Sequence, residues 1–329
     1  MDPLERRTLG SSGLEVTRLG LGCAALGGLY GDIPEEQADL VVHAALDLGL
    51  NLFDTAPLYG SGKSETRVGR GLQDAPRDNY LLASKVGRVL VPTDDENRGG
   101  IFDNLPPLKP VFDYSHDGIM RSVEESLERL KLDRIDILHI HDPDNHYDEA
   151  IRFAYPALDK LRSEGTIKAV SAGMNQWEML ARFAREGDFD CFLLAGRYSL
   201  LEQESLDELL PLCLEKDIGI MAGGTYNSGI LAKGSGEKGA KYNYGDPPAE
   251  IVDKARRLEA VAKRHDVDIK AVASQFALAH PAVTCIIPGT RRPERVQENF
   301  DLLKVEIPAQ LWVELRDEEL IRADAPVPE

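Results

Sequence analysis

The stretch 51–85, NLFDTAPLYGSGKSETRVGRGLQDAPRDNYLLASK, decides the fold class of this chain. It begins with a short apolar strand at 51–53, continues into an expected helix at 63–72, and ends in an apolar strand at 80–85. A strand, a helix and a second strand in succession predict two parallel strands joined by a crossover helix. The same alternation continues in both directions along the chain.

Before this stretch, the sequence predicts a β-hairpin from 6–9 and 14–21, and a helix that Pro34 opens and Gly49 ends. After it, the expected elements are helix 115–130, strand 135–140, helix 148–164, strand 167–171, helix 176–185, strand 191–194, helix 205–216, strand 218–222, helices 250–264 and 269–279, strand 283–287, and helices 293–303 and 309–320. Eight strand–helix units predict an α/β protein, a (β/α)8 TIM barrel with an N-terminal β-hairpin. We expect one domain, 1–329, because no linker divides the chain.

Two long segments interrupt the alternation. Residues 88–114 contain many prolines and glycines without periodicity, and residues 223–248 are rich in Gly, Tyr and Asn. Long segments without secondary structure in a compact domain are usually lids or binding loops. We therefore expect both at the C-terminal face of the strands, where they would select the substrate.

The composition limits the classes of partner. The chain has 329 residues and a formal net charge of -18, so nucleic acid and anionic membranes are poor partners. No apolar run approaches membrane-spanning length, and the N-terminus lacks the apolar core of a signal peptide. We expect a cytoplasmic protein, a monomer or small homo-oligomer, that acts on a small molecule. The cysteines have wide spacings and no CxxC pair, which indicates reduced, buried thiols: they are Cys23, Cys191, Cys213 and Cys285.

Polar residues follow three neighbouring strands at the points where these strands end. Asp54 ends the second, Lys85 the third and His141 the fourth, while Tyr59 lies in the loop after the second. In TIM barrels the active site forms at the C-terminal ends of the strands. Closure of the barrel should therefore bring these four residues together.

Their chemistry fits a proton transfer. A free tyrosine has a pKa of about 10, and a neighbouring lysine ammonium favours the phenolate and lowers that pKa. In this arrangement Lys85 would activate Tyr59, Asp54 would fix Lys85, and His141 would hydrogen-bond the substrate oxygen. Proton transfer at a carbonyl or alcohol also needs a hydride partner, which predicts a nicotinamide cofactor.

Four segments resemble the aldo-keto reductase family, in the family's order. They are FDTAPLYGSGKSETRVGRGL (53–72), ASK (83–85), DILHIHDPD (136–144) and IPGTRRPERVQEN (287–299). The resemblance implies that Tyr59 is the general acid/base, that Lys85 and Asp54 tune it, and that His141 orients the substrate. It also implies NAD or NADP as the cofactor.

The resemblance further implies a set of cofactor-binding residues. Arg291 and Arg295 would approach the adenosine ribose or its 2′-phosphate, while Glu298 and Asn299 would hold the adenine. Guanidinium groups and a helix N-terminus near residue 293 suit a phosphate on physical grounds as well. The complete set is Gly22, Cys23, Asp54, Asn175, Tyr198, Gly224, Ser228, Gly289, Arg291, Arg295, Glu298 and Asn299.

A finer resemblance points to one branch of the family. AVSAGMNQW (169–177), RYSLLEQ (197–203), NSGILA (227–232) and the stretch 242–248 resemble bacterial D-threo-aldose and L-fucose 1-dehydrogenases, with pyridoxal 4-dehydrogenase as a near neighbour. This implies oxidation of an aldose C1 hydroxyl to a lactone, with Tyr59 as base. Carbonyl or aldehyde reduction, and oxidation of pyridoxal, are the alternatives within the family.

The chain departs from the broader family around the nicotinamide. The departures are Gly173 and Met174 in place of Ser-Asn after the fifth strand, Ala195 in place of Gln after the sixth, and Gly223 in place of an aromatic residue after the seventh. Asn175 is therefore expected to hold the carboxamide. Gly289 occupies a position where many NADP-dependent members have Lys, so the sequence leaves NAD and NADP both open.

Two hypotheses of another class compete with an oxidoreductase. His139 and His141 share one face of a strand and could bind a metal in a barrel hydrolase. No other strand end offers a histidine ligand set, so we expect no metal and place His139 deeper in the barrel. The other hypothesis is a non-catalytic subunit that keeps the barrel and binds cofactor without turnover.

Overall fold

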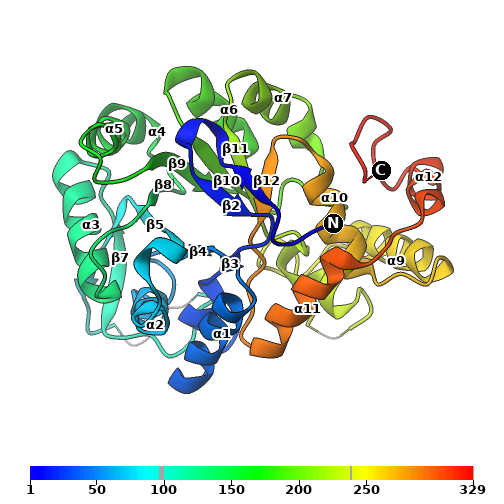
Figure 1. Ribbon diagram of the computed structural model, residues 1–329, viewed down its shortest axis with the longest axis horizontal. Helices are drawn as coiled ribbons and strands as arrows, with labels where there is room; N and C mark the ends of the chain where they lie inside the picture. Colours follow the sequence, from blue (N-terminus) through cyan, green and yellow to red (C-terminus); the bar gives the residue numbers. More distant parts are fainter. Residues whose placement is uncertain (96–99, 238, 329) are drawn as a thin grey trace.

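A computed structural model of the protein describes residues 1–95, 100–237 and 239–328. Its centre is a parallel sheet of eight strands in the order β12-β11-β10-β9-β8-β5-β4-β3 (Figure 1). The strands are β3 (Leu21–Gly22), β4 (Leu52–Asp54), β5 (Leu81–Val86), β8 (Ile137–His141), β9 (Ala169–Met174), β10 (Cys191–Ala195), β11 (Gly219–Gly223) and β12 (Val283–Ile286).

The two edges of this sheet meet and close the barrel. Parallel bridges join Leu19 to Ile286 and Gly22 to Gly289. The Gly20 N–H donates to the Ile286 carbonyl oxygen at 2.9 Å. The expected (β/α)8 barrel is therefore confirmed.

Helices cover the outside of the barrel, as alternation requires. The main helices are α1 (Glu35–Asp47), α2 (Lys63–Leu72), α3 (His116–Leu130), α5 (Tyr155–Ser163), α6 (Trp177–Glu186), α7 (Leu209–Glu215), α9 (Ala249–Arg264), α10 (Ile269–Ala279), α11 (Pro293–Lys304) and α12 (Ala309–Asp317). A short α4 (Tyr147–Glu149) precedes α5, and a π-helical segment at 150–154 connects the two. Their buried faces pack on the strands in one large apolar layer.

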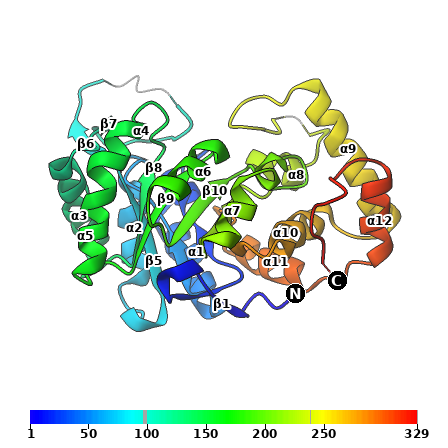
Figure 2. The ribbon, with the colours of Figure 1, turned by 90° about the horizontal axis from the view of Figure 1, so that it is seen from above.

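The N-terminal hairpin closes the end of the barrel opposite the strand carboxyl ends. It consists of β1 (Arg6–Thr8) and β2 (Glu15–Thr17), paired antiparallel. Leu9 and Val16 are fully buried and join the apolar cluster inside the barrel. In Figure 2 the hairpin lies on one side, while β6, β7 and the loop before α9 lie on the other. This expected hairpin is confirmed, and it leaves only the carboxyl ends of the strands open.

The prediction of an aperiodic segment at 88–114 is wrong in part. Strands β6 (Arg88–Pro92) and β7 (Leu108–Phe112) form an antiparallel pair in which Arg88 faces Phe112. Such a pairing is non-local, and the prolines around β7 obscure its strand pattern. Residues 96–99 of the segment lie outside the described residues. The segment 223–248 also contains the short helix α8 (Ile230–Lys233).

Two smaller expectations concern thiols and membranes. All four cysteines are free and buried, as expected. Across the described ranges, no helix combines the length and apolar character needed to span a membrane.

Candidate active site

Asp54 and Lys85 form a buried ion pair at the carboxyl ends of neighbouring strands. The Lys85 Nζ lies 2.6 Å from Asp54 Oδ1 and 2.7 Å from Oδ2, and it also donates to the Thr55 carbonyl oxygen at 3.0 Å. The side chains are 1% and 3% exposed. Lys85 is therefore fixed in position, and a bidentate partner neutralises its charge.

Tyr59 lies beside this pair. The Lys85 Nζ is 5.1 Å from the centroid of the Tyr59 ring, and the ring meets the His141 imidazole edge to face at 5.8 Å. A Cβ on Gly27 would lie 2.5 Å from the Tyr59 carbonyl carbon, so only glycine allows this close approach. The structure thus brings Asp54, Tyr59, Lys85 and His141 together at the barrel mouth.

The pKa of Tyr59 departs from 10 in the direction opposite to the expected one. Burial is the largest cause of its rise well above 10, and the Asp54 carboxylate raises it further. The reason is that Asp54 neutralises Lys85, so the pair presents little net positive charge to the phenol. Tyr59 is therefore protonated at neutral pH, and a role as base requires further positive charge nearby.

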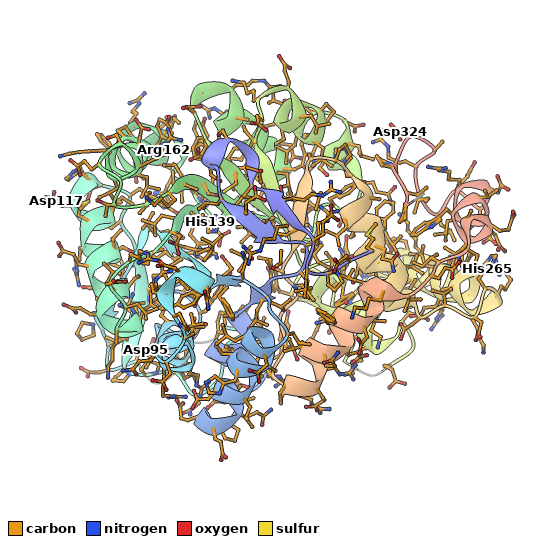
Figure 3. The ribbon with its side chains drawn as sticks, viewed as in Figure 1. Asp95, Asp117, His139, Arg162, His265 and Asp324 are labelled. Atoms are coloured by element: carbon orange, nitrogen blue, oxygen red, sulfur yellow. The ribbon has the colours of Figure 1, made fainter. Side chains whose placement is uncertain are left out.

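His139 and His141 occupy different depths of β8. His139 is fully buried inside the ring of strands (Figure 3), with Nδ1 2.7 Å from Ser171 Oγ and Nε2 3.3 Å from Asp54 Oδ1. His141 ends the strand at the mouth. Burial and then the charge of Arg88 hold the pKa of His141 well below 6.5, so its imidazole is neutral.

The two histidines of the metal-hydrolase hypothesis contact different groups. His139 contacts Ser171 and Asp54, whereas His141 contacts Arg88. In the portions of the chain that the structure describes, no group of three or more His, Cys, Asp or Glu residues is arranged to hold a metal ion.

Sequence reasoning missed two charged residues of this site. Arg88 Nη1 and Nη2 each lie 3.1 Å from Asp142 Oδ2, and Nη1 lies 3.3 Å from His141 Nδ1. The guanidinium carbon is 4.8 Å from the Phe112 ring centroid. Only the closeness of Arg88 to Lys85 in sequence could have indicated it, because its strand was not predicted.

The segment 223–248 reaches the mouth through Tyr244. The Tyr244 backbone N–H donates to Ser228 Oγ at 3.0 Å, and the Tyr244 hydroxyl hydrogen-bonds to the Asn175 side chain. The Asn175 Nδ2 in turn donates to the Ala195 carbonyl oxygen at 2.7 Å. Asn175 and Ser228 are therefore brought together beneath one loop.

The expected adenosine segment begins α11. Arg295 and Glu298 form an ion pair, and Glu298 also pairs with Lys270. Asn299 Oδ1 accepts a hydrogen bond from the Tyr226 hydroxyl at 3.0 Å. Arg291, by contrast, points toward Tyr30 and donates to its carbonyl oxygen at 3.1 Å. Arg295, Glu298 and Asn299 thus form one polar group, and Arg291 lies beside a different loop.

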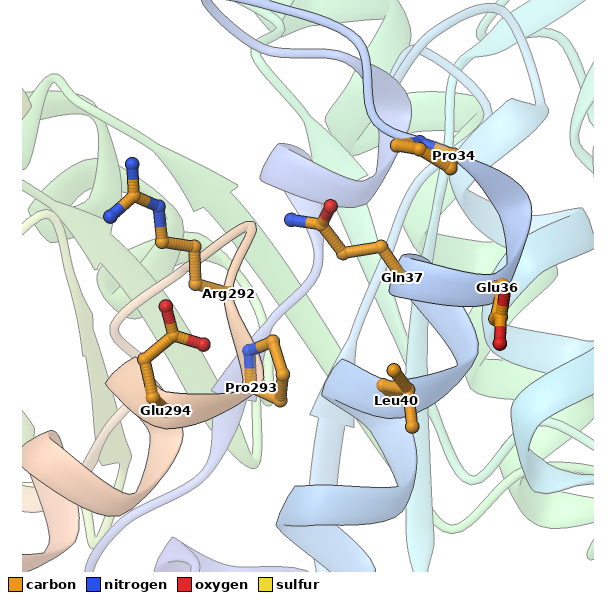
Figure 4. A pocket seen from close by; sticks show the side chains of 7 residues that line it. All are labelled: Pro34, Glu36, Gln37, Leu40, Arg292, Pro293 and Glu294. Carbon is orange, nitrogen blue, oxygen red and sulfur yellow. The ribbon is translucent and has the colours of Figure 1, made fainter.

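An open hollow of about 610 Å³ lies between α1 and the first turn of α11 (Figure 4). It is lined by Pro34, Glu36, Gln37, Leu40, Arg292, Pro293 and Glu294. It contains none of the proton-transfer residues and neither Arg291 nor Arg295, so it is distinct from the barrel mouth.

Comparison with known proteins decides the family. The model of the "Aldo/keto reductase family" matches residues 18–317. The chain belongs to the aldo/keto reductase family.

Its relatives share most of its length. It is 40% identical to D-threo-aldose 1-dehydrogenase of a Pseudomonas species, over 94% of this chain and 96% of that protein. It is 39% identical to pyridoxal 4-dehydrogenase of Microbacterium luteolum, over 96% and 98%. Among solved structures, glycerol dehydrogenase of Gluconobacter oxydans superposes with a TM-score of 0.77 at 26% identity, over 100% of this chain and 98% of that one. An aldo-keto reductase of Bacillus halodurans in its holo form gives 0.76 at 26% identity, over 99% and 98%.

This aldo-keto reductase is an NAD(P)-dependent oxidoreductase that acts on CH–OH groups. The residues present fit a nicotinamide nucleotide. Thr225 Oγ1 and Asn227 Oδ1, after β11, are buried without a hydrogen-bond partner among the described residues, which suits a polar ligand. The first turn of α11, with Pro293 at its start and no side-chain cap, suits a phosphate.

Two glycines of the expected cofactor set have a structural reason for being glycine. A Cβ on Gly289 would lie 2.9 Å from the Gly22 carbonyl oxygen, and a Cβ on Gly22 would lie 2.5 Å from the Ile287 carbonyl oxygen. Barrel closure therefore requires a small residue at 289 in this aldo-keto reductase. The lack of a lysine there does not distinguish NAD from NADP.

The structure places two further expected residues. The Cys23 N–H donates to the Asp54 carbonyl oxygen at 2.8 Å, beside the catalytic pair. Gly224 has a φ of 62° and approaches Gly196 at the end of β10, where a Cβ would lie 3.1 Å from its backbone nitrogen. Exposed Gly224 can therefore offer backbone to a ligand at the mouth of this aldo-keto reductase, whereas Cys23 is fully buried and its carbonyl oxygen accepts a hydrogen bond from Ser64.

Tyr198 as a cofactor contact stays a prediction, and the structure packs its ring against other aromatic residues. Its side chain is 1% exposed, and its ring stacks on Phe276 at 5.4 Å and meets His280 edge to face. Burial of a large aromatic ring in the outer apolar layer outweighs exposure at the mouth.

Proposed function

We propose that this aldo-keto reductase oxidises the C1 hydroxyl of a cyclic aldose to a lactone. The single observation that carries the proposal is the assembly of Tyr59 with His141 and the Asp54–Lys85 pair at the barrel mouth. The 40% identity to D-threo-aldose 1-dehydrogenase supports an aldose as substrate.

The chain's own residues account for the proton in this reaction. Tyr59 accepts the proton of the C1 hydroxyl, and neutral His141 donates an N–H to the same oxygen as it becomes a carbonyl. Lys85, held by Asp54, stabilises the phenolate form. A bound oxidised nicotinamide supplies the hydride acceptor and a positive charge that favours the phenolate.

The same proposal assigns the nucleotide contacts. Asn175 holds the nicotinamide carboxamide, since the loop around Tyr244 fixes it at the mouth. Arg295, Glu298 and Asn299 form the adenosine site. Arg291 is assigned to the ribose or its phosphate. The remaining residues line the nucleotide site: Gly22, Cys23, Asp54, Gly224, Ser228 and Gly289.

A substrate panel tests the proposal. Purified enzyme is assayed for nicotinamide reduction with L-fucose, D-arabinose, L-galactose and pyridoxal, each with NAD⁺ and with NADP⁺. We expect an aldose to give the highest kcat/KM. Preference for pyridoxal, or activity only as a carbonyl reductase, would reassign the substrate. Tight nucleotide binding without turnover would favour the non-catalytic hypothesis.

Localisation and assembly complete the proposal. We place the enzyme in the cytoplasm as a monomer or small homo-oligomer that acts on a small molecule and not on nucleic acid or membranes. The net charge of -18 supports the exclusion of nucleic acid and anionic membranes. Light scattering of the purified protein measures the oligomeric state, and fractionation of its host cell measures the location.

A further inference from the structure

The two ring nitrogens of His141 face groups of opposite hydrogen-bonding character. A guanidinium can only donate, and Arg88 Nη1 lies 3.3 Å from His141 Nδ1. A proton on Nδ1 would therefore oppose an N–H of Arg88. The geometry requires Nδ1 to be the acceptor.

Asp142 favours the same tautomer through the other ring nitrogen, Nε2. Its Oδ2 lies 3.4 Å from His141 Nε2, which favours a proton on that nitrogen. The distance exceeds that of a good hydrogen bond, so the N–H stays available to a substrate oxygen. Asp142 also holds Arg88 through both Nη atoms, and its backbone N–H donates to Gly173.

The Arg88 guanidinium is itself well fixed. The register of β6 and β7 places Phe112 opposite Arg88, with the guanidinium carbon 4.8 Å from the ring centroid. The Arg88 side chain is 12% exposed. A partly buried, doubly held cation can set the orientation of a neighbouring ring in a way that a mobile surface residue cannot.

We propose that Arg88 and Asp142 are positioning residues that hold His141 as its neutral tautomer with the proton on Nε2. The N–H is thereby aimed at the substrate oxygen in every turnover. The identity of that oxygen rests on the proposed function, but the tautomer itself does not. Burial and the Arg88 charge oppose an imidazolium at His141, whereas the Asp142 carboxylate would favour it, so burial is the main reason that His141 is neutral.

Other charged groups face His141 from neighbouring elements. Lys85 on β5 and His139 on β8 lower its pKa as Arg88 does, although burial is the largest cause. The Tyr59 ring covers one side of the imidazole. Of these groups, only Arg88 contacts Nδ1, so the tautomer specifically requires Arg88.

The direct test is ¹⁵N NMR of histidine-labelled enzyme, with the His141 signals assigned by their loss in His141→Gln. In the wild type we expect Nε2 to be protonated and Nδ1 unprotonated. In Arg88→Met we expect a mixture of tautomers, and in Arg88→Lys, which keeps the charge, a partial return to the wild-type state. Unchanged His141 signals in both Arg88 variants would overturn the proposal.

Kinetics supply a second readout. Loss of the Arg88 charge raises the pKa of His141, so kcat of Arg88→Met should fall as the pH drops through that raised pKa. Near neutral pH we expect kcat to fall about 10- to 100-fold, as when a residue that orients a catalytic ligand is lost, with KM for the nucleotide unchanged. A kcat and pH profile equal to those of the wild type would contradict a positioning role.

Arg77 provides a matched control. It pairs with Asp136 at 2.7 Å, lies 4.7 Å from the Tyr80 ring centroid, and is 14% exposed, but it lies away from the mouth. Arg77→Met should lower stability without changing the His141 signals. If no aldose is oxidised by the wild type, the proposed function fails, while the NMR comparison still decides the role of Arg88.

Discussion

The protonation of Tyr59 depends more on its burial than on Lys85. Its pKa lies well above 10, because burial and Asp54 both oppose the phenolate. Oxidation needs the phenolate and reduction needs the phenol. Bound oxidised nicotinamide lowers this pKa, so we expect kcat for aldose oxidation to rise about tenfold per pH unit below the Tyr59 pKa of the nicotinamide complex, while kcat for carbonyl reduction stays level there. Stopped-flow rates from pH ~6 to ~10 measure both, and a level oxidation profile would contradict the assignment of Tyr59 as base.

Asp54 matters for stability as well as for chemistry. Asp54→Asn leaves the Lys85 ammonium buried without its partner, which should lower the free energy of unfolding by about 3–5 kcal/mol. Chemical denaturation measures this loss. Glu5→Gln, which breaks the exposed Arg7–Glu5 pair, should cost no more than about 1 kcal/mol. Equal losses in the two variants would show that the buried pair stabilises the protein no more than an exposed pair does.

The Asp54 carboxyl also gives stability a defined pH dependence. Burial raises its pKa, but Lys85 and the hydrogen bond from His139 together outweigh burial, so the pKa in the folded protein lies below the usual value. This contribution is present above the unfolded-state pKa and is lost as the pH falls through the folded-state pKa. Asp54→Asn should therefore show a smaller loss of stability on acidification than the wild type, as measured by urea denaturation at several acidic pH values.

Single residues also show what sequence could and could not predict. The strand ends identified Asp54, Lys85 and His141, because barrel geometry places such ends at one mouth. The direction of the Tyr59 pKa was not predictable, since burial and charge neutralisation depend on three-dimensional contacts. The packing of Tyr198 was not predictable either, because a resemblance in sequence does not specify which way an aromatic ring packs.

At the scale of elements, the loop that carries Tyr59 packs against the turn before α1. A Cβ on Gly27 would lie 2.5 Å from the Tyr59 carbonyl carbon and 2.8 Å from the Gly60 nitrogen. Gly27→Ala should displace Tyr59 and lower kcat up to about 100-fold, as small misplacements of catalytic groups do.

Gly69 is the control for this substitution. A Cβ there would lie 1.9 Å from the Leu130 carbonyl oxygen, between α2 and α3. Gly69→Ala should therefore lower the melting temperature while the folded enzyme keeps its kcat. If both variants lose only stability, the packing of Gly27 does not position Tyr59.

The elements themselves were predictable to different degrees. Helices such as α2 and α3 have clear periodicity and end where expected. The β6–β7 pair was missed because its strands are short and its pairing is non-local, and Arg88 was missed with it. The substrate side of the mouth was therefore the least predictable part of the site.

At the scale of the whole molecule, the barrel closes through glycines. Gly22→Ala would place a Cβ 2.5 Å from the Ile287 carbonyl oxygen, so we expect a loss of about 1–3 kcal/mol in unfolding free energy. At Gly223, also at the mouth, an added Cβ meets neighbours at 3.5 Å or more, and Gly223→Ala should leave stability unchanged. Calorimetry compares the two, and equal stability would show that closure tolerates a side chain.

The barrel was predictable because strict alternation of eight strands and their helices admits few topologies. The contacts between Gly22 and Gly289 that close the barrel were not visible in the sequence. They explain why residue 289 is a glycine better than cofactor preference does. Function also depends on the whole barrel, because its closure brings residues of separate strands to one proton-transfer site.

In the proposed reaction, this site removes a hydride from C1 of an aldose and a proton from the C1 hydroxyl. The most direct measurement follows the label from C1-deuterated L-fucose with NAD⁺ or NADP⁺, in the wild type and in Tyr59→Phe. We expect deuterium to move to the nicotinamide ring as the sugar becomes a lactone, and we expect Tyr59→Phe to abolish both. Deuterium retained in the sugar product, or full transfer by Tyr59→Phe, would contradict the proposed reaction.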